Sequence, residues 1–431
     1  MAGATAAVAM LATTAIAQEA PAQPDNGWSF ASVSLATGVN TGYQLAFDPV
    51  GRQVYLSDAN WRGEEKRPDG TIVVTRYATG KLVVFDVDSR AWVANHSFLG
   101  LSRSDGSGTD ADPLNWAGVE AETNSSNRSS FSPYGVAVDG TTTNAAGEVD
   151  PTVITTTARG RDPALGYGGH VVVYNASQGG PTDADRIWQF EDGTPIFDGI
   201  RRIALNTTTH KAYISNFGDA RGESGRPGFV AVVDLPTRTV EARVRVPETW
   251  GAIGVAVDEQ NNLIYVGTLT GPGLYVIDGD AIDTSNAQDL SLNDGAITQL
   301  EAVVGENARP TYSPELKRLY VSTFARDGGV INVVDADPAS AAYGTIIGTI
   351  ETGATNSVAV DGERGLLYSA NLGDQEVVVF DANTFEELLR LPSTGNALNI
   401  GIDPETHDVW VSNFSSASFV NVFSVFQDPK G

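Results

Sequence analysis

Arginine residues are concentrated in a few segments of an acidic chain of 431 residues with a formal net charge of −26. Ten of the 27 Lys and Arg residues lie in four segments that together contain 82 of the 431 positions. About five would fall there by chance, so the segments carry roughly twice their share of basic residues. The segments are 59–80, 97–132, 158–169 and 217–228. Guanidinium groups bind carboxylate and phosphate through paired hydrogen bonds. The pattern predicts a site for a small anion, unless most of these arginines pair with the protein's own carboxylates.

Further candidate side chains stand close to apolar runs of the sequence. Arg201 and Arg202 open one such run, and Arg326 follows another. Trp61 lies in the first arginine-containing segment, where it could stack on a ligand or cover the protein core. We interpret seven residues as candidates for ligand binding and none as catalytic: Arg201, Arg202, Tyr134, Asn356, Asn399, Arg326 and Trp61.

A short repeat indicates which elements position these residues. An apolar run ending in a polar residue is followed by a turn and by a second run with an aromatic residue, and the aromatic follows the polar residue by seven positions in six copies. The copies are 45–58, 203–216, 255–268, 311–323, 358–371 and 400–413, and a seventh copy with a longer turn spans 135–157. Alternating runs rich in Val, Ile and Tyr, separated by Gly, Asn and Asp turns, are typical of antiparallel strands. The Asp residues at the strand ends are expected to cap turns through backbone N–H groups.

Each unit continues with a third apolar run, and most have a fourth, as in 230–234 and 241–246. Four strands per unit at a minimum period of 42 residues, from 361 to 403, are typical of a propeller blade. The last unit ends after its third strand, and the run 28–35 is available as the missing one. We therefore predict an all-β fold, a single seven-bladed β-propeller of four-stranded antiparallel blades with the last blade closed by the N-terminal strand.

The strand pairs LYVST (319–323) and AYISN (212–216), each followed by an apolar run ending in Asp, resemble the YVTN-family β-propeller repeat. The resemblance covers nearly all of residues 28–426. It implies an exported bacterial or archaeal protein of undefined or binding function, although related propellers include quinoprotein dehydrogenases, lactonases and lyases. Architecture alone therefore does not supply a reaction.

In a propeller, the four arginine-containing segments would be insertions on one face around the central channel. Tyr134, Asn356 and Asn399 would begin inner strands and face the channel mouth. Long loops on a rigid scaffold commonly carry function, with neutral surface decoration as the alternative.

Metal and nucleophilic chemistry have weaker support. The absence of Cys excludes thiolate metal sites and disulfides, and no G-x-S-x-G motif occurs. None of the four His residues begins an inner strand, which argues against a His-bound metal or haem in the channel. Calcium could bind Asp-rich turns, although their spacing matches no known loop and solvated turns explain them better. The two turns contain Asp105, Asp110 and Asp112, and Asp278, Asp280 and Asp283.

The charge and the N-terminal segment bear on the partners and the localisation of the protein. The net charge argues against nucleic-acid binding, and we expect a monomer without a membrane span. The apolar start and the Ala15-Ile16-Ala17 pattern predict a signal peptide (1–17), despite the missing basic region. A linker (18–27), the propeller (28–426) and a C-terminal tail (427–431) follow, in a periplasmic or secreted protein.

The sequence thus favours an exported, non-catalytic propeller that binds a small anionic ligand or a protein partner on its inserted face, with no cofactor assigned. The alternative is a metal-dependent propeller enzyme of lactonase, lyase or phosphatase type. Three or more carboxylates at the channel mouth would favour the enzyme. A mouth lined by Arg, Asn and aromatic residues would favour binding.

Overall fold

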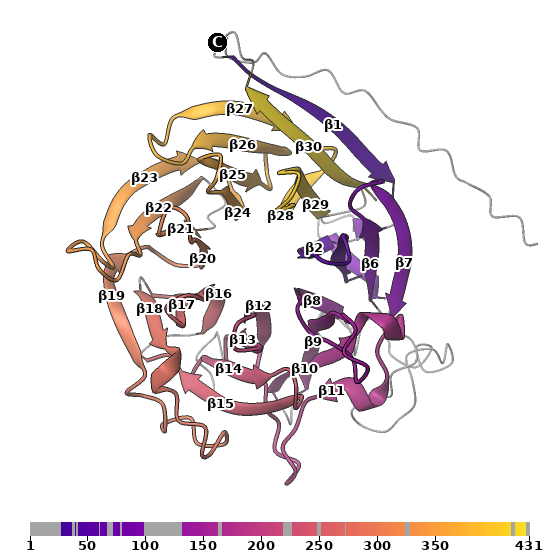
Figure 1. The fold of residues 1–431 in the computed structure, drawn as a ribbon, viewed down its shortest axis with the longest axis vertical. Coiled ribbons are helices and arrows are strands. Elements are labelled where there is room, and N and C mark those ends of the chain that lie inside the picture. Colours follow the sequence, from indigo (N-terminus) through magenta and orange to yellow (C-terminus); the bar gives the residue numbers. More distant parts are fainter. Residues whose placement is uncertain are drawn as a thin grey trace, which may run out of the picture.

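Twenty-eight of the strands in the computed structural model form seven four-stranded antiparallel sheets arranged as blades around a central axis (Figure 1). This confirms the predicted all-β, seven-bladed propeller. The structure describes residues 27–36, 39, 42–59, 61–66, 72–77, 80–98, 132–162, 166–218, 226–247, 251–271, 273–323, 328–414 and 419–427. The expected signal peptide, nearly all of the expected linker and most of the expected tail lie outside these residues.

The first three blades follow one another along the chain. The first contains β2 (Gly42–Asp48), β3 (Gln53–Asp58), β6 (Lys81–Asp86) and β7 (Ala91–Ser97). The second contains β8 (Ser132–Asp139), β9 (Thr152–Asp162), β10 (Gly166–Asn175) and the short β11 (Arg186–Ile187). The third contains β12 (Ile200–Asn206), β13 (Lys211–Asn216), β14 (Phe229–Asp234) and β15 (Thr239–Arg245). Two short 3-10 helices, η2 (Ala176–Gln178) and η3 (Asp183–Asp185), precede β11.

The next three blades repeat the same order from the channel outward. The fourth contains β16 (Ala252–Asp258), β17 (Leu263–Thr268), β18 (Gly273–Asp278) and β19 (Ile297–Val303), with η4 (Gly279–Ala281) after β18. The fifth contains β20 (Ala308–Ser313), β21 (Arg318–Thr323), β22 (Gly329–Asp335) and β23 (Ile346–Thr352). The sixth contains β24 (Thr355–Asp361), β25 (Leu366–Asn371), β26 (Glu376–Asp381) and β27 (Glu387–Pro392).

The seventh blade joins the two ends of the described chain. Its strands are β28 (Asn396–Ile402), β29 (Val409–Phe414), β30 (Phe419–Gln427) and, outermost, β1 (Trp28–Ala36). The register of β1 against β30 runs without a shift from Trp28 opposite Gln427 to Ala36 opposite Phe419. Backbone groups of β30 that would otherwise form an open sheet edge are therefore paired.

The first inserted segment contains regular structure that the sequence analysis placed in a loop. Strands β4 (Trp61–Lys66) and β5 (Ile72–Tyr77) pair with each other as a separate hairpin. The β-branched run 72–75 provides a strand with high β-propensity, which explains the difference. Trp61, in the segment that we expected to form a loop, is instead the first residue of β4.

The core lies between blades. Seven clusters of buried apolar side chains each join two neighbouring sheets, including the seventh and the first. The aromatic residues of the sequence repeat are completely buried in these clusters: Tyr55, Tyr213, Tyr265, Tyr320, Tyr368 and Trp410. The aromatic residue recurs in the sequence repeat because each blade needs one large side chain to fill the space beside its neighbour. As predicted, Asp residues at strand ends cap turns, for example Asp48, whose Oδ1 accepts the N–H of Val50 at 3.0 Å.

Blades four and five approach closely at Gly267, where the repeat usually has Ser. A Cβ added to Gly267 would lie 2.1 Å from the carbonyl oxygen of Ala308. We expect Gly267→Ala to lower the free energy of unfolding by about 1–3 kcal/mol, because the backbone of a packed blade must shift. Gly295→Ala is the matched control, since an added Cβ there meets no atom within 4 Å. Equal denaturation midpoints for both variants would contradict the prediction.

Candidate functional site

One position on every inner strand forms a ring around one end of the central channel. In six blades it lies eleven residues before the buried aromatic residue, and in the second blade it is the residue before Val136. We call these residues the arginine ring: Gln44, Gly135, Arg202, Gly254, Arg309, Ser357 and Asn399. Arg202 thus has glycines at the same level on both neighbouring blades. A Cβ at Gly135 would lie 2.8 Å from the carbonyl oxygen of Arg201, and one at Gly254 would lie 2.8 Å from the Cα of Arg309, so these glycines let neighbouring inner strands approach closely.

Hydroxyl groups of the second strands fix the backbone of this ring. In β12 the register shifts between Ile200 and Ile203, so that Arg201 and Arg202 lie together opposite Ser215. The N–H of Arg202 donates to the Oγ of Ser215 at 3.0 Å. Equivalent bonds of 2.9 Å and 2.7 Å hold Gln44 to Ser57 and Gly135 to Thr156. The Ser that follows the aromatic residue in the repeat therefore positions the site.

Two guanidinium groups converge at this end of the channel from different blades. The electrostatic neighbours of Arg202 are Arg309 of the fifth blade and Tyr134 of the second. Arg309 in turn lies near Tyr134 and Arg201, and its Nη1 donates to the carbonyl oxygen of Asn356 at 3.4 Å. No ion pair joins Arg202 to a carboxylate among the described residues.

Burial and like charge disfavour the cation of Arg202. Burial, followed by the charge of Arg309, lowers the pKa of its guanidinium from the usual 12.5 to about 9. Burial also lowers the pKa of Arg309, to which the charge of Arg201 contributes. With a pKa of about 9, the guanidinium of Arg202 remains charged at neutral pH. An anion bound between the two guanidinium groups would provide the opposite charge that the described protein groups do not supply to Arg202.

Arg201 has a different environment from its neighbour. Its guanidinium carbon lies 4.1 Å from the ring centre of Phe217 and 5.0 Å from that of Tyr134, and its Nη1 donates to the carbonyl oxygen of Ile200. Tyr134 also stacks on Tyr43, with ring centres 4.0 Å apart. Cation–π contact and packing therefore account for Arg201. It supports the aromatic side of the channel mouth.

The two candidate asparagines connect neighbouring blades. Asn399 is 3% exposed, accepts the N–H of Leu45 at 3.1 Å and donates to the Oγ of Ser357 at 3.1 Å. The Nδ2 of Asn356 donates to the carbonyl oxygen of Leu398 at 2.7 Å. Both amides hold adjacent inner strands in place, and Asn399 also lines the channel.

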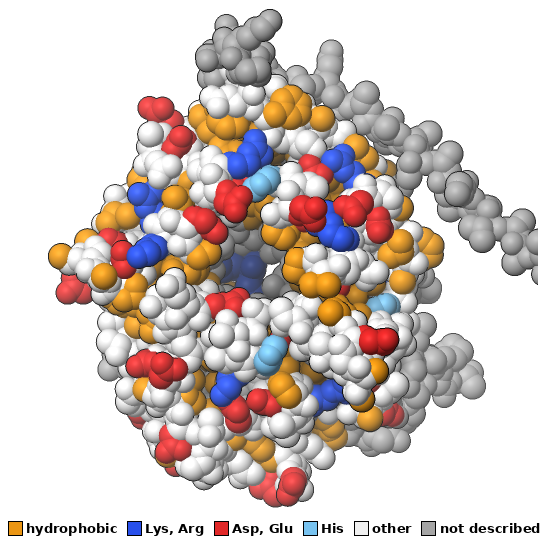
Figure 2. Space-filling model, in the orientation of Figure 1, with side chains coloured by type: hydrophobic (Ala, Val, Ile, Leu, Met, Phe, Trp, Pro, Cys, Tyr) orange, Lys and Arg blue, Asp and Glu red, His pale blue; other side chains and the backbone are white. Residues whose placement is uncertain are grey.

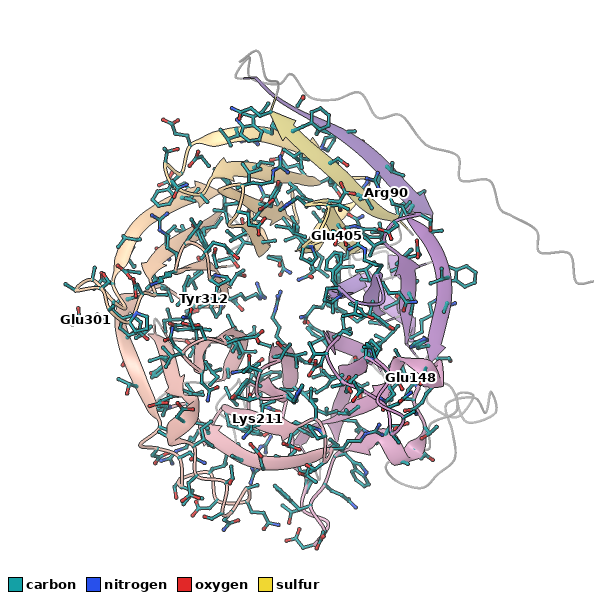
Figure 3. The ribbon with its side chains drawn as sticks, in the orientation of Figure 1. Arg90, Glu148, Lys211, Glu301, Tyr312 and Glu405 are labelled. Atoms are coloured by element: carbon teal, nitrogen blue, oxygen red, sulfur yellow. The ribbon has the colours of Figure 1, made fainter. Side chains whose placement is uncertain are left out.

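The channel contains a cavity of about 420 Å³. Its polar lining at one end consists of Gln44, Arg202, Ser357 and Asn399. Among the described residues that line it, Arg202 is the only charged one. Figure 2 shows the hollow at the centre of the ring with Lys or Arg side chains inside it. Figure 3 shows Tyr312, another lining residue, on the inner side of the ring and Glu301 on its periphery.

The structure thus brings Tyr134, Arg201 and Arg202 together, with Asn356 and Asn399 on adjoining strands. Arg326 lies outside the described residues, and the side chain of Trp61 is likewise not described. Sequence reasoning missed Arg309. Its signal was present, because Arg309 precedes Tyr320 by the same eleven residues that separate Arg202 from Tyr213.

The Asp-rich turns considered as calcium sites have a local structural role where the structure describes them. The Oδ1 of Asp278 accepts the N–H of Asp280, and the Oδ1 of Asp283 accepts that of Ser285, as expected for capped turns. The turn with Asp105, Asp110 and Asp112 lies outside the described residues. Within the described ranges, no three His, Asp or Glu side chains gather as ligands for one metal ion.

The fold and the channel define the protein as a seven-bladed β-propeller with an arginine-lined channel end. No protein-family model matches the chain, and no curated protein matches it either. Among the described residues, no helix has the length and hydropathy needed to cross a membrane.

Proposed function

We propose that this protein is an exported, non-catalytic propeller of the YVTN type that binds a small anion at the arginine end of its central channel. The observation that carries the proposal is the deeply placed guanidinium of Arg202, beside Arg309 and without a carboxylate partner among the described residues. Gln44, Ser357 and Asn399 line the same space and offer further hydrogen-bonding groups. The strand motifs and the apolar N-terminal segment support the YVTN resemblance and export.

The test is binding of acetate, phosphate and sulfate to the wild type and to Arg202→Met, measured by calorimetry and by thermal shift. Hydrogen bonds to a charged group contribute about 1.5–3 kcal/mol, so we expect roughly ten- to hundredfold weaker binding in the variant. Arg245→Met is the matched control, because Arg245 pairs with Asp294 at the surface and both side chains are 41% exposed. Arg245→Met changes the net charge by the same amount as Arg202→Met, and it should bind these anions as tightly as the wild type does.

The Arg202→Met substitution should leave the ligand-free protein as stable as the wild type or make it more stable. Because burial lowers the pKa of Arg202 to about 9, the unfolded chain binds more protons than the folded chain between that pH and about 12.5. Arg202 therefore costs stability at neutral pH, and this cost decreases above pH 9. Weaker anion binding that merely follows a lower melting temperature, or unchanged binding in Arg202→Met, would contradict the proposal.

A further inference from the structure

Two cations lie at the same level of the channel on inner strands that are not neighbours in the ring. Arg202 belongs to β12 of the third blade and Arg309 to β20 of the fifth, and both occupy the arginine-ring position of their strand. Arg202 lines the cavity, and so does Pro310, the residue after Arg309. Arg309 acts on Arg202 as a like charge, so the fold holds two positive charges within electrostatic reach of each other.

Protein hydrogen bonds hold both arginines at this end of the channel. The backbone of Arg202 is bonded to Ser215, as described above. The guanidinium of Arg309 reaches toward the sixth blade, where its Nη1 donates to the carbonyl oxygen of Asn356 at 3.4 Å. A carbonyl oxygen orients a guanidinium group but carries no full charge to neutralise it. The repulsion between the two cations is therefore part of the folded ring.

The neighbouring side chains add positive rather than negative charge. Tyr134 is an electrostatic neighbour of both Arg202 and Arg309, and its ring is stacked on Tyr43 with ring centres 4.0 Å apart. A phenol is uncharged at neutral pH. Arg201, whose guanidinium carbon lies 5.0 Å from the ring centre of Tyr134, acts on Arg309 as a further like charge. The site therefore attracts more than one negative charge.

Two neutral side chains at the same level have hydrogen-bond donors to spare. The side-chain amide of Gln44 makes no hydrogen bond within the described part of the chain. The Oγ of Ser357 accepts the Nδ2 of Asn399 at 3.1 Å, which leaves its hydroxyl hydrogen without an acceptor among the described residues. Gln44 and Ser357 both line the cavity with Arg202. Amide, hydroxyl and guanidinium groups can all donate to the oxygens of an oxyanion.

We infer that the ligand is a small divalent oxyanion whose two charges are bound by Arg202 and Arg309. This inference rests on the proposed function and specifies the charge of its ligand. A monovalent anion would neutralise one guanidinium group and leave the other facing a like charge, whereas a divalent anion neutralises both. Gln44 and Ser357 donate to the remaining oxygens. Sulfate- or phosphate-type groups and dicarboxylates share this chemistry, and a cavity of about 420 Å³ has room for either.

The experiment measures the affinities of matched anions for the full chain by calorimetry at constant ionic strength. Sulfate is compared with methanesulfonate, which has a similar tetrahedral head but a single charge. Malonate and succinate are compared with propionate and butyrate, which lack the second carboxylate. The second charged contact should make the divalent member bind about ten- to hundredfold more tightly. A preference confined to sulfate assigns a compact tetrahedral group, and one confined to the dicarboxylates assigns two carboxylates.

Substitutions at Arg309 test its contact with the second charge. Arg309→Met should bring the affinity for the divalent anion close to that for its monovalent partner, while the monovalent anion binds nearly as before. Arg309→Lys keeps the positive charge and should retain most of the preference, which separates loss of charge from damage to the ring. If Arg309→Met fails to fold, Arg309→Lys and the comparison of the anions on the wild type still test the inference.

Arg318→Met is the matched control on the same blade. The Nη1 of Arg318 also donates to a carbonyl oxygen of the sixth blade, that of Ala382 at 2.9 Å. Arg318 lies opposite Ser313, however, at the end of β20 that is far from the arginine ring. This substitution removes one charge and one contact between blades, and it should leave the preference for divalent anions unchanged.

The outcomes distinguish this inference from the proposed function. Arg202-dependent binding with equal affinities for divalent and monovalent anions would overturn the divalent ligand and leave the proposed anion site intact. A divalent preference that survives Arg309→Met, or that is lost equally in Arg318→Met, would overturn the contact with Arg309. No binding of any anion would refute both the inference and the proposed function.

Discussion

A chain that begins at Gly38, and so lacks β1, is expected to lose cooperative folding or to aggregate. Leu35 is buried against the first blade, where Val33 also packs, and Trp28 and Phe30 pack against the cluster between the sixth and seventh blades. A fully buried apolar side chain contributes about 1.5–3 kcal/mol, and of these four Leu35 is buried whereas the other three are partly buried. Their combined loss is therefore a large fraction of the stability of a typical domain, about 5–15 kcal/mol.

The truncation also opens the ring. Removal of β1 would expose the outer edge of β30 along its entire length, from Phe419 to Gln427. Unpaired edges of this kind template pairing with other chains. Differential scanning calorimetry and size-exclusion chromatography would measure both effects. A chain beginning at Gly27 retains β1 and is the control. If the chain beginning at Gly38 melts at the same temperature as this control, β1 is not needed to close the seventh blade.

The blade structure could be predicted from the repeat because the features that define a blade depend on residues close together in the sequence. A strand, a tight turn and a large side chain between blades all fall within 14 residues, so their spacing is visible in one copy such as 203–216. Tyr213 is buried because it fills the space beside the next blade. Inner-strand starts could be located from the same spacing, which explains why Arg202 and Asn399 were found to line the channel.

The different roles of Arg201 and Arg202 could not be predicted in this way. The two residues are adjacent and chemically identical, but the register shift in β12 directs one against Phe217 and the other into the cavity. Such an irregularity depends on packing between blades. The convergence of Arg202 and Arg309 likewise depends on the closure of the ring, since 107 residues and two blade boundaries separate them.

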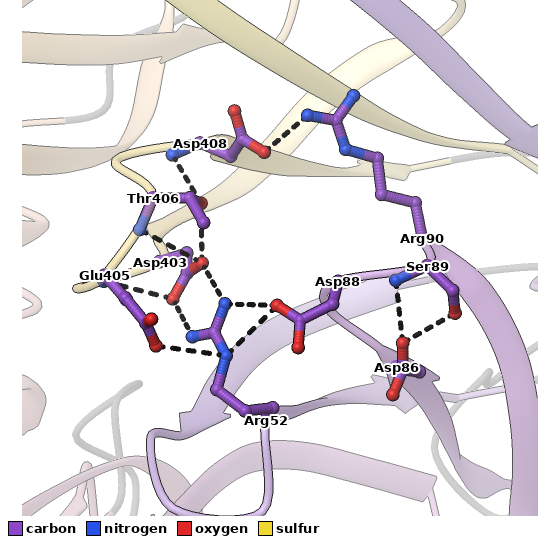
Figure 4. Close-up of polar contacts among 9 residues, drawn as sticks. All are labelled: Arg52, Asp86, Asp88, Ser89, Arg90, Asp403, Glu405, Thr406 and Asp408. Carbon is purple, nitrogen blue, oxygen red and sulfur yellow. Dashed lines mark hydrogen bonds and ion pairs between the residues drawn. The ribbon is translucent and has the colours of Figure 1, made fainter.

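Contacts between the last and first blades could not be predicted from the sequence pattern either, because they join residues far apart in the chain. Arg52, in the turn between β2 and β3, has a left-handed backbone with φ of 51°. Its guanidinium donates to both carboxylate oxygens of Asp403, 351 residues away, at 2.7 and 2.9 Å, and to Asp88 at 2.6 Å (Figure 4). Burial alone would raise the pKa of Asp403, but hydrogen bonds from Arg52 and Thr406 outweigh it and lower that pKa.

Arg52→Met is therefore expected to reduce the free energy of unfolding by about 3–5 kcal/mol at pH 7, since it leaves a buried carboxylate without its cation. The side chain of Asp403 is completely buried, whereas that of Arg52 is 18% exposed. The lowered pKa of Asp403 means that its contribution is present above the unfolded pKa of about 4 and is lost as the pH falls further. Without Arg52, burial should raise this pKa, so the deficit of the variant should shrink in acid.

Urea denaturation of the wild type and Arg52→Met at pH 7 and pH 4 would measure this dependence. Arg245→Met is again the control, because the exposed pair with Asp294 should contribute only about 0–1 kcal/mol. Adding Asp403→Asn to Arg52→Met should restore part of the lost stability, since an amide carries no charge. A deficit no larger than that of the control, or one that grows as the pH falls, would show that the pair does not hold the first and last blades together. Anion binding should remain normal in the folded fraction of Arg52→Met, because Arg52 lies in a turn at the opposite end of the inner strands from the arginine ring.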